Sequence, residues 1–348
     1  MGPPPILILM CDQQRADATS CAGDPVLRTP HMDRICAEGV RFSNACSVSP
    51  VCMPARASFV SGLYPHNHGL WTNRGALPAD DETFFHHLQR IGYHVMYVGK
   101  SHFYGHGGFH LREREPYMHR RGIDTVHETT GPWATVTTRS YMTDHWETRG
   151  LYEVFKQDYE KRRKAGAVRC TWPSPLPEEE HLDSYIGRVA CELAQAYDED
   201  KPLCLFVGFG GPHEPWDPPR RHAEMYDPAD CPLPIPAEEL PATIPPHARR
   251  RALAGRMEIP EEQARKIRAL YCGKIALIDE WFGRILEVYA RRGWLDDALI
   301  IHWSDHGEML GDHGRLHKCV FYDGSLKIQF NVRWPGHIQA GAVCDSLV

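Results

Sequence analysis

Short apolar runs separated by polar stretches recur four times along the chain, at residues 6–10, 94–98, 203–208 and 299–304. Such a run, without alternation of polar and apolar positions, is typical of a strand buried on both faces of a parallel sheet. Segments with helical signals lie between the runs, at residues 32–38, 82–91, 179–197 and 261–292. Strands that alternate with helices predict an α/β fold, with a mostly parallel central sheet covered by helices on both faces.

Two long segments do not follow this pattern. Residues 212–260 are rich in proline and charged side chains, and residues 105–175 are rich in His, Arg and Trp. We interpret the first as a long ordered excursion over the surface that could form a pocket wall. We expect the second to be irregular and to line a substrate pocket.

The composition indicates a globular protein with a large core. The chain has 348 residues, of which 42% are hydrophobic and 24% are charged, enough for one large domain or two smaller ones. Its formal net charge is −6, from 39 basic and 45 acidic residues. This charge gives no electrostatic reason to expect binding to nucleic acid or to an anionic membrane. An anionic substrate would have to be held by local positive charge.

Twelve cysteines in a chain of this length are too dilute for a scaffold built on disulfides, so we expect mostly reduced thiols. The first ten residues have no basic region before their apolar run and do not resemble a secretory signal. No stretch approaches the roughly 20 apolar residues that a membrane span needs. We expect a cytoplasmic location, or a periplasmic or secreted one if a leader has been removed.

Carboxylates stand at the ends of two predicted strands. Asp12-Gln13 follows the first run and Asp305-His306 follows the last, and ligands of open α/β sheets collect beyond the carboxyl ends of the strands. Carboxylate and amide oxygens suit Ca²⁺ or Mg²⁺, whereas a histidine shifts the balance towards Mn²⁺ or another transition metal. Either aspartate alone is more often the cap of a loop or turn. The pair at matching strand ends favours a metal site.

The segment VCMPARASFVSG, residues 51–62, predicts a helix that begins near Cys52, because Pro54 suits a first turn. At that place, free N–H groups and the helix dipole stabilise an anion and lower the pKa of a thiol. Arg56, one turn later, could neutralise a nucleophile or a substrate. An isolated C-x-P-x-R could equally be a capping cysteine beside a surface arginine, but the polar groups at the strand ends argue against that interpretation.

Cationic and imidazole groups form a third set, with Lys100 and His102 in GKSHF, His213 in GPHEP and Lys318 in HKCVFYDG. A lone histidine is more often structural and a lone lysine solvated, but several such sites near strand ends indicate a common purpose. They could neutralise a sulfate or phosphate and protonate a leaving group. Further histidines after residue 306 leave zinc as an alternative, disfavoured because no C-x-x-C pair occurs.

Together these motifs resemble the sulfatase family of the alkaline phosphatase superfamily, from residue 6 to about residue 334. The C-x-P-x-R signature of Cys52, Pro54 and Arg56 is the sequence read by the enzyme that converts cysteine to formylglycine, and SDHGEMLGDHG at residues 304–314 makes the match specific. The resemblance implies an alkaline phosphatase-like fold, with residues 1–348 as the N-terminal catalytic domain. The family normally continues into a smaller C-terminal subdomain, so a truncated chain is expected.

The resemblance also implies roles for particular residues. The metal ligands would be Asp12, Gln13, Asp305 and His306, completed by the modified Cys52, with Ca²⁺ favoured and Mn²⁺ or Mg²⁺ as alternatives. The sulfate would be surrounded by Arg56, Lys100, His102, His213 and Lys318. Asn73, in LWTNRG, would be a polar substrate contact.

The implied reaction is hydrolysis of a small-molecule or carbohydrate sulfate ester, with a formylglycine-generating enzyme as partner. Gln13 and His306, however, resemble the phosphonate monoester and phosphodiester hydrolases of the superfamily, whereas Lys100 and His102 resemble true sulfatases. Hydrolysis of phosphonate monoesters or phosphodiesters at the same site is therefore the alternative. A metal-binding protein of this fold without activity is a further one. Four tryptophans could stack on a sugar or aryl group or simply pack in the core: Trp71, Trp133, Trp146 and Trp216.

Overall fold

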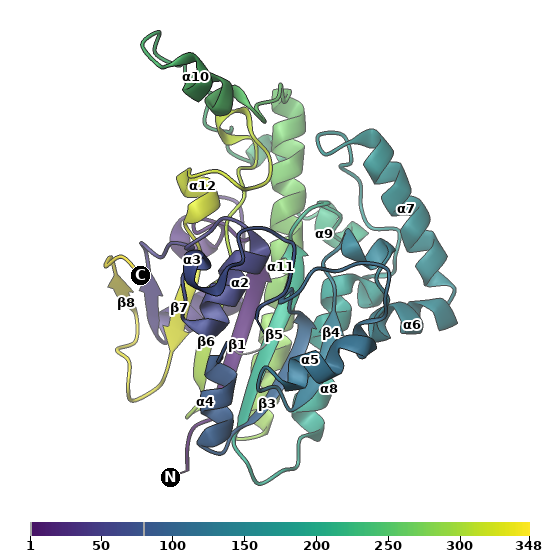
Figure 1. The fold of residues 1–348 in the computed structure, drawn as a ribbon, viewed down its shortest axis with the longest axis vertical. Coiled ribbons are helices and arrows are strands. Elements are labelled where there is room, and N and C mark those ends of the chain that lie inside the picture. The colour runs from purple at the N-terminus through teal and green to yellow at the C-terminus, as the bar shows by residue number, and fades with distance from the viewer. Residues whose placement is uncertain (1, 79–80) are drawn as a thin grey trace.

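The computed structural model describes residues 2–78 and 81–348. Its centre is an eight-stranded sheet in the order β4-β3-β5-β1-β6-β7-β2-β8, with helices on both faces (Figure 1). The strands are β1 (Ile6–Asp12), β2 (Val40–Phe42), β3 (His94–Lys100), β4 (Thr125–Thr129), β5 (Leu203–Pro212), β6 (Leu299–Ser304), β7 (Phe330–Arg333) and β8 (Ala342–Cys344). The predicted α/β class, with a mostly parallel sheet, is confirmed.

The four apolar runs are four neighbouring parallel strands, in the order β3-β5-β1-β6. Ile8 of β1 lies between Phe206 and Ile301 in the register, and all seven residues of β1 are buried. Alternate side chains of a strand point to opposite faces, so Leu7 and Leu9 join one core cluster, and Ile6, Ile8 and Met10 join the other. Burial on both faces explains the continuous apolar runs.

Each face of the sheet is covered by its own helices. One layer contains α1 (Pro30–Ala37), α8 (Leu182–Ala196) and the long α11 (Glu261–Arg291); the other contains α2 (Cys52–Ser61) and α4 (Phe84–Arg90) (Figure 1). All four predicted helices are present, with ends within about three residues of those expected. The remaining α-helices are α3 (Pro65–His68), α5 (Glu115–His119), α6 (Tyr141–Thr148), α7 (Leu151–Ala165), α9 (Arg220–Ala223), α10 (Pro246–Leu253) and α12 (Asp323–Leu326).

The expectation that residues 105–175 are irregular is wrong, because they contain β4 and the helices α5, α6 and α7. The charge of α7 hid its periodicity, yet Tyr152, Phe155 and Tyr159 recur at helical spacing and are buried. Residues 212–260 do form a long excursion with little regular structure, in which α10 projects away from the sheet (Figure 1).

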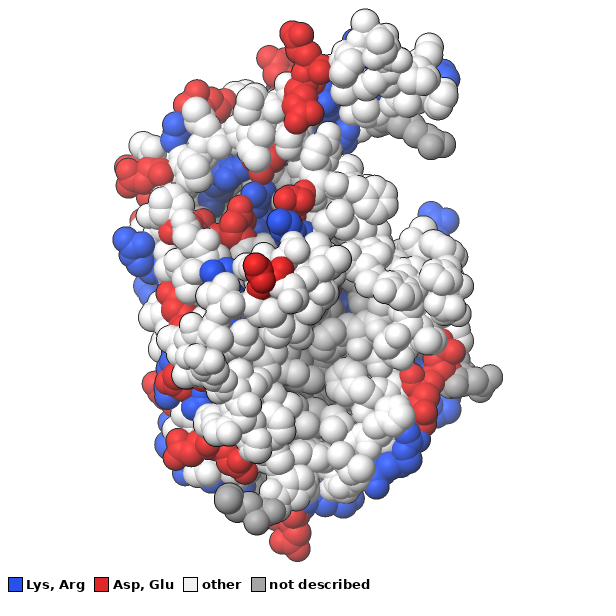
Figure 2. All heavy atoms as spheres, turned by 90° about the vertical axis from the view of Figure 1, so that its left-hand side faces the viewer, with Lys and Arg blue, Asp and Glu red and all other residues white. Residues whose placement is uncertain are grey.

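All twelve cysteines are free, as expected. Among the described residues, no helix is long and apolar enough to cross a membrane. The face that carries β8 has few charged side chains at its centre, whereas acidic and basic side chains gather above and around it (Figure 2).

Candidate active site

The predicted convergence of strand ends is present. Parallel pairing places Cys11 of β1 beside Ser304 of β6, so the next residue of each strand, an aspartate, lies at the same sheet edge. One potential ligand atom from each of four buried residues lies within 4.8 Å of the others, and these residues are Asp12, Cys52, Asp305 and His306. The side chain of Cys52 enters this group because α2 begins at Cys52.

In each of the two aspartates, one carboxylate oxygen binds Arg56 and is called the outer oxygen here. The other oxygen is called the inner one. Arg56 Nη2 donates to Asp12 Oδ2 and its Nε to Asp305 Oδ2, both at 2.8 Å. The inner oxygens face the other ligand atoms: Asp12 Oδ1 is 3.9 Å from Cys52 Sγ, and Asp305 Oδ1 is 3.6 Å from His306 Nε2. Two carboxylate oxygens and an imidazole nitrogen around one centre, with the outer oxygens held by cations, fit a divalent ion.

Gln13 is held beside this centre in the left-handed region, with φ 69°, which a side chain larger than glycine adopts only at some cost. Its backbone N–H donates to Asp305 Oδ1 at 3.0 Å. Its side-chain amide nitrogen donates to Glu214, at 2.9 Å, and to Glu308. Because both carboxylates accept from the nitrogen, the amide oxygen is turned the other way, where it accepts from Lys318.

Basic side chains surround the thiol of Cys52. Lys318 Nζ lies 3.3 Å and His306 Nε2 lies 3.2 Å from Cys52 Sγ. Burial disfavours the thiolate, but Lys318, Lys100 and His306 outweigh it and hold the pKa of Cys52 well below its usual value. Burial also disfavours the ammonium of Lys318, yet Cys52 and Asp12 raise its pKa above the usual range. A negative charge at residue 52 is thus strongly stabilised.

Lys100, at the end of β3, donates to the outer oxygen of Asp12. Burial and Cys52 raise the pKa of Asp12, but Lys100 and Arg56 prevail and lower it below the usual range. The strand reaches this position because Gly99 has φ +97°, and a Cβ there would meet the carbonyl oxygen of Gly208 at 2.1 Å. Only glycine allows so close an approach.

Three further predicted site residues, His102, His213 and Asn73, differ in their surroundings. His102 is partly buried and its ring stacks on His106, with centroids 4.9 Å apart; burial lowers the pKa of His102, which favours the neutral imidazole. His213 is half-buried, and its Nδ1 lies 3.0 Å from Glu214 Oε2. Asn73 is exposed, and its side-chain oxygen accepts from the backbone N–H of Met53 at 3.0 Å. It therefore holds the start of α2, and its contact with a substrate stays a prediction.

Sequence reasoning missed two carboxylates beside the centre, Glu214 and Glu308. Fully buried, Glu308 accepts from Gln13 and from the backbone N–H groups of Leu310 and His317. It thereby ties Gln13 to the loop that carries Lys318. Both glutamates lie inside motifs that the sequence had marked, GPHEP and SDHGEMLGDHG. A one-dimensional motif does not distinguish a carboxylate that would bind metal from one that orients a ligand.

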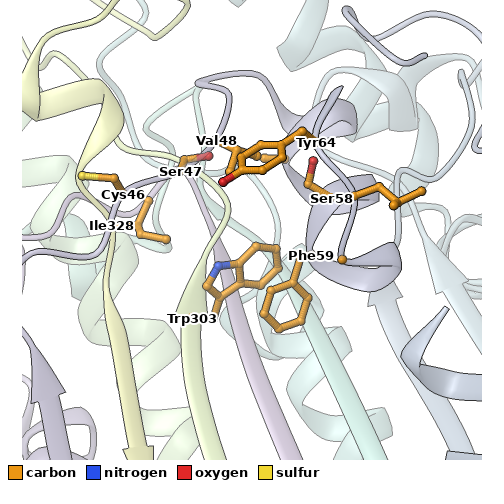
Figure 3. Close-up of a pocket in the computed structure, with 11 residues that line it drawn as sticks. Cys46, Ser47, Val48, Ser58, Phe59, Tyr64, Trp303 and Ile328 are labelled. Atoms are coloured by element: carbon orange, nitrogen blue, oxygen red, sulfur yellow. The ribbon is translucent and has the colours of Figure 1, made fainter. Parts of the chain in front are cut away.

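A prominent apolar pocket, of about 310 Å³, lies elsewhere (Figure 3). Trp303 and Phe59 stack at its base with ring centroids 3.8 Å apart, and Tyr64 lies above them. None of the four ligand-bearing residues lines this pocket. The candidate active site is therefore defined by its polar groups and not by this apolar pocket.

The order and direction of the strands place this protein in the class of alkaline phosphatase-like α/β proteins, with the polar cluster beyond the carboxyl ends of the central strands. Within that class, the model of the sulfatase family matches residues 4–346. The chain belongs to the sulfatase family.

Two curated relatives and one solved structure show the range of its similarities. Choline-sulfatase of Rhizobium meliloti is 28% identical over 344 residues, covering 96% of this chain and 63% of that protein. N-acetylglucosamine-6-O-sulfatase of Bacteroides thetaiotaomicron is 24% identical over 99% of this chain and 65% of its own length. The crystal structure of a phosphonate monoester hydrolase of Agrobacterium radiobacter superposes with a TM-score of 0.77 at 25% identity, covering 98% of this chain and 70% of that one. The chain thus spans less than two thirds of both curated relatives.

Proposed function

We propose that this sulfatase-family hydrolase cleaves sulfate esters to an alcohol and inorganic sulfate, with a formylglycine hydrate at residue 52 as the nucleophile. The observation that carries the proposal is the position of Cys52, at the start of α2, within 4.8 Å of ligand atoms of Asp12, Asp305 and His306. Sulfated small molecules and carbohydrates are the proposed substrates, since relatives include choline-sulfatase and N-acetylglucosamine-6-O-sulfatase.

The residues that would hold a divalent ion are Asp12, Gln13, Asp305 and His306, together with modified residue 52. When bound, such an ion supplies Lewis acidity, which stabilises a deprotonated hydroxyl and the charge on the sulfate. Ca²⁺ is the proposed ion, with Mg²⁺ or Mn²⁺ as alternatives.

The first half of the reaction transfers the sulfuryl group to residue 52. The aldehyde hydrate carries two hydroxyls on one carbon; one, deprotonated, attacks sulfur while the bond from sulfur to the ester oxygen breaks. Arg56 and Lys100 neutralise the carboxylates around the nucleophile. Lys318 lies 3.3 Å from the side chain of residue 52 and is protonated, so it or His213 gives a proton to the departing alcohol.

The second half releases sulfate. The remaining hydroxyl of residue 52 loses its proton to His102, the carbonyl forms, and the bond between this carbon and the sulfate oxygen breaks. Hydration of the aldehyde then restores the nucleophile. His102 is suited to accept the proton because burial favours its neutral form. A thiolate could attack once but has no second hydroxyl with which to expel the product.

We expect the thiol to be oxidised before the chain folds, because Cys52 is only 1% exposed in the folded protein and a formylglycine-generating enzyme would reach it more readily in the unfolded chain. This partner is part of the proposal.

Substitution of the nucleophile gives the direct test of function. Cys52→Ala should abolish hydrolysis of an aryl sulfate, whereas Cys204→Ala, at another fully buried thiol in β5, should retain activity within a few-fold. Circular dichroism and thermal melting of both variants would control for folding. Turnover by Cys52→Ala at the wild-type rate would sink the mechanism.

Hydrolysis of phosphonate monoesters or phosphodiesters at the same site is the second candidate. Gln13 and His306 favour it, as does the likeness to a phosphonate monoester hydrolase. Comparing kcat/KM for an aryl sulfate, a phosphodiester and a phosphonate monoester at equal metal loading separates the candidates. The sulfate should be preferred, and a preference for either phosphorus ester would reverse the assignment.

A further inference from the structure

A second cavity, of about 350 Å³, lies beside the reaction centre. It lies between the C-terminal end of α7 and the loop that follows β5, which are parts of the two long segments singled out in the sequence. The side chains that define its chemistry are Trp133, Arg163, Cys170, Glu214, Trp216 and His317. Its volume suits a sugar ring or a small aryl group.

The cavity shares residues with the surroundings of Cys52. Glu214, in its wall, accepts a hydrogen bond of 2.9 Å from Gln13. His317, also in its wall, directly precedes Lys318, whose Nζ is 3.3 Å from Cys52 Sγ. A group attached to a sulfate at residue 52 could therefore extend into this cavity.

Two of the four tryptophans singled out in the sequence meet here. Trp146 is fully buried in the core and Trp71 is 65% exposed elsewhere, whereas the cavity is lined by the partly buried Trp133 and by Trp216, which is also fully buried. The ring of Trp216 stacks parallel to that of His317, with centroids 6.1 Å apart. Among the described residues, its buried indole N–H has no hydrogen-bond partner, although buried donors normally have one. Of the two indoles, only the partly buried Trp133 offers a surface on which a sugar ring could stack.

The charged side chains of the cavity wall have ion-pair or hydrogen-bond partners, with one exception. The guanidinium of Arg162 is occupied by Asp158 and by backbone carbonyls, and Glu214 is occupied by Gln13 and by two histidines. Among the described side chains, the exposed Arg163 has no ion pair or hydrogen bond, although it lies near enough to Glu160, which pairs with Lys164, to lower the pKa of that carboxyl. A free guanidinium disfavours a cationic leaving group such as choline and favours an anionic one.

We propose that this cavity is the leaving-group subsite and that it takes a sugar ring carrying a second anionic group, which pairs with Arg163. The proposal rests on the proposed sulfatase function. Trp133 contacts a face of the ring, and Arg163 selects for its extra charge. The substrate class is thus a multiply sulfated or carboxylated saccharide.

The test uses two sugars that differ by one anionic group, D-glucosamine 6-sulfate and D-glucosamine-2-N,6-O-disulfate. Arg163→Ala should lower kcat/KM for the disulfate about 10-fold, the loss expected for one charge-assisted contact, and should leave the monosulfate unchanged. The matched control is Lys164→Ala, which removes the same charge from the same helix but outside the cavity; it should change neither. Equal effects of Arg163→Ala on both sugars, or a preference of the wild type for choline sulfate over both, would overturn the subsite.

Binding separates this proposal from the function on which it rests. In the Cys52→Ala background, calorimetry should show tighter binding of the disulfate than of the monosulfate, and Arg163→Ala should remove the difference. If that pattern appears without turnover by the wild type, the proposed function fails and the subsite stands. If the wild type hydrolyses both sugars but Arg163→Ala leaves the disulfate preference intact, the function stands and the subsite is overturned.

Discussion

Glu308 is a buried carboxylate that positions residues of the candidate active site without being one of the proposed metal ligands. It accepts from the amide of Gln13 and from two backbone N–H groups of the loop that carries Lys318. Its own position therefore fixes which atom of Gln13 faces the centre. Gln13 is one of the proposed metal ligands, and groups that orient a metal ligand commonly influence metal affinity as much as activity.

Glu308→Gln should weaken binding of Ca²⁺ about 10- to 100-fold. The variant side chain carries a donor amide where Glu308 only accepts, so it cannot satisfy Gln13 and both backbone groups together. Calorimetric titration of the metal-free protein measures the effect. Glu128→Gln, at another fully buried glutamate, serves as the control. Unchanged metal affinity in Glu308→Gln would show that the carboxylate plays no positioning role.

Glu128 itself predicts a pH effect on stability. Burial raises its pKa from 4.5 to about 7, although hydrogen bonds from Ser101 and Tyr104 oppose the rise. Between those two pH values the folded state binds more protons than the unfolded state. The contribution of this group is therefore fully present below pH 4.5 and is lost as the pH rises through about 7.

Relative to Glu128→Gln, the wild type should lose roughly 3 kcal/mol of unfolding free energy across that window. Urea unfolding of both proteins at a series of pH values gives the difference. Glu239→Gln, at an exposed glutamate, should show a flat difference. A flat difference for Glu128→Gln as well would mean that Glu128 is charged in the folded protein at neutral pH.

At the scale of elements, the continuous apolar runs were sufficient to predict β1, β3, β5 and β6, because a strand buried on both faces has no polar alternation. The start of α2 followed from Pro54 and the placement of Cys52. The short strands β2, β7 and β8 were not predicted. With three or four residues each, they have too little pattern to separate from loops, and their pairing is set by tertiary contacts.

The candidate site, too, could be predicted from the sequence only in part, because some of its contacts depend on tertiary structure. Asp12 and Asp305 could be brought together from the sequence, because parallel strands end at a common edge, whereas Cys52 joined them only through the resemblance to the sulfatase family. Glu214 and Glu308 could not be assigned roles, since their partners are distant in the chain and depend on the left-handed backbone of Gln13. The sequence predicted that residues 105–175 line a pocket, but not that the helix α7 lies there, because the charged face of α7 masks its buried aromatic residues.

Asn73 supports α2 from outside the helix. Asn73→Ala removes the acceptor of the Met53 N–H and should lower the unfolding free energy by about 1 kcal/mol. Asn67→Ala, at an exposed asparagine of α3, should cost less. Urea unfolding measures both. If Asn73 also contacts the substrate, KM for an aryl sulfate rises in Asn73→Ala, whereas a change in neither stability nor KM would remove both roles.

For the whole molecule, the buried charges at the sheet edge are already balanced without a metal, because Arg56 and Lys100 pair with Asp12 and Arg56 also pairs with Asp305. Removal of the metal should therefore lower the melting temperature without unfolding the protein. At a hundredfold excess over Kd, the ion contributes about 2.7 kcal/mol. Melting curves with EGTA and with added Ca²⁺ measure this shift, and Asp12→Asn should diminish it. Identical curves with and without Ca²⁺, Mg²⁺ or Mn²⁺ would argue against a metal centre.

The central claim is that the sheet edge holds an oxidised residue 52 as the nucleophile. Its most direct test is the peptide mass of the segment around residue 52, measured on protein produced with and without a formylglycine-generating enzyme, alongside aryl sulfatase activity of the same samples. Activity should rise in proportion to the fraction of Cys52 converted to the aldehyde. Full activity in a sample whose residue 52 is entirely an unmodified thiol would contradict the central claim.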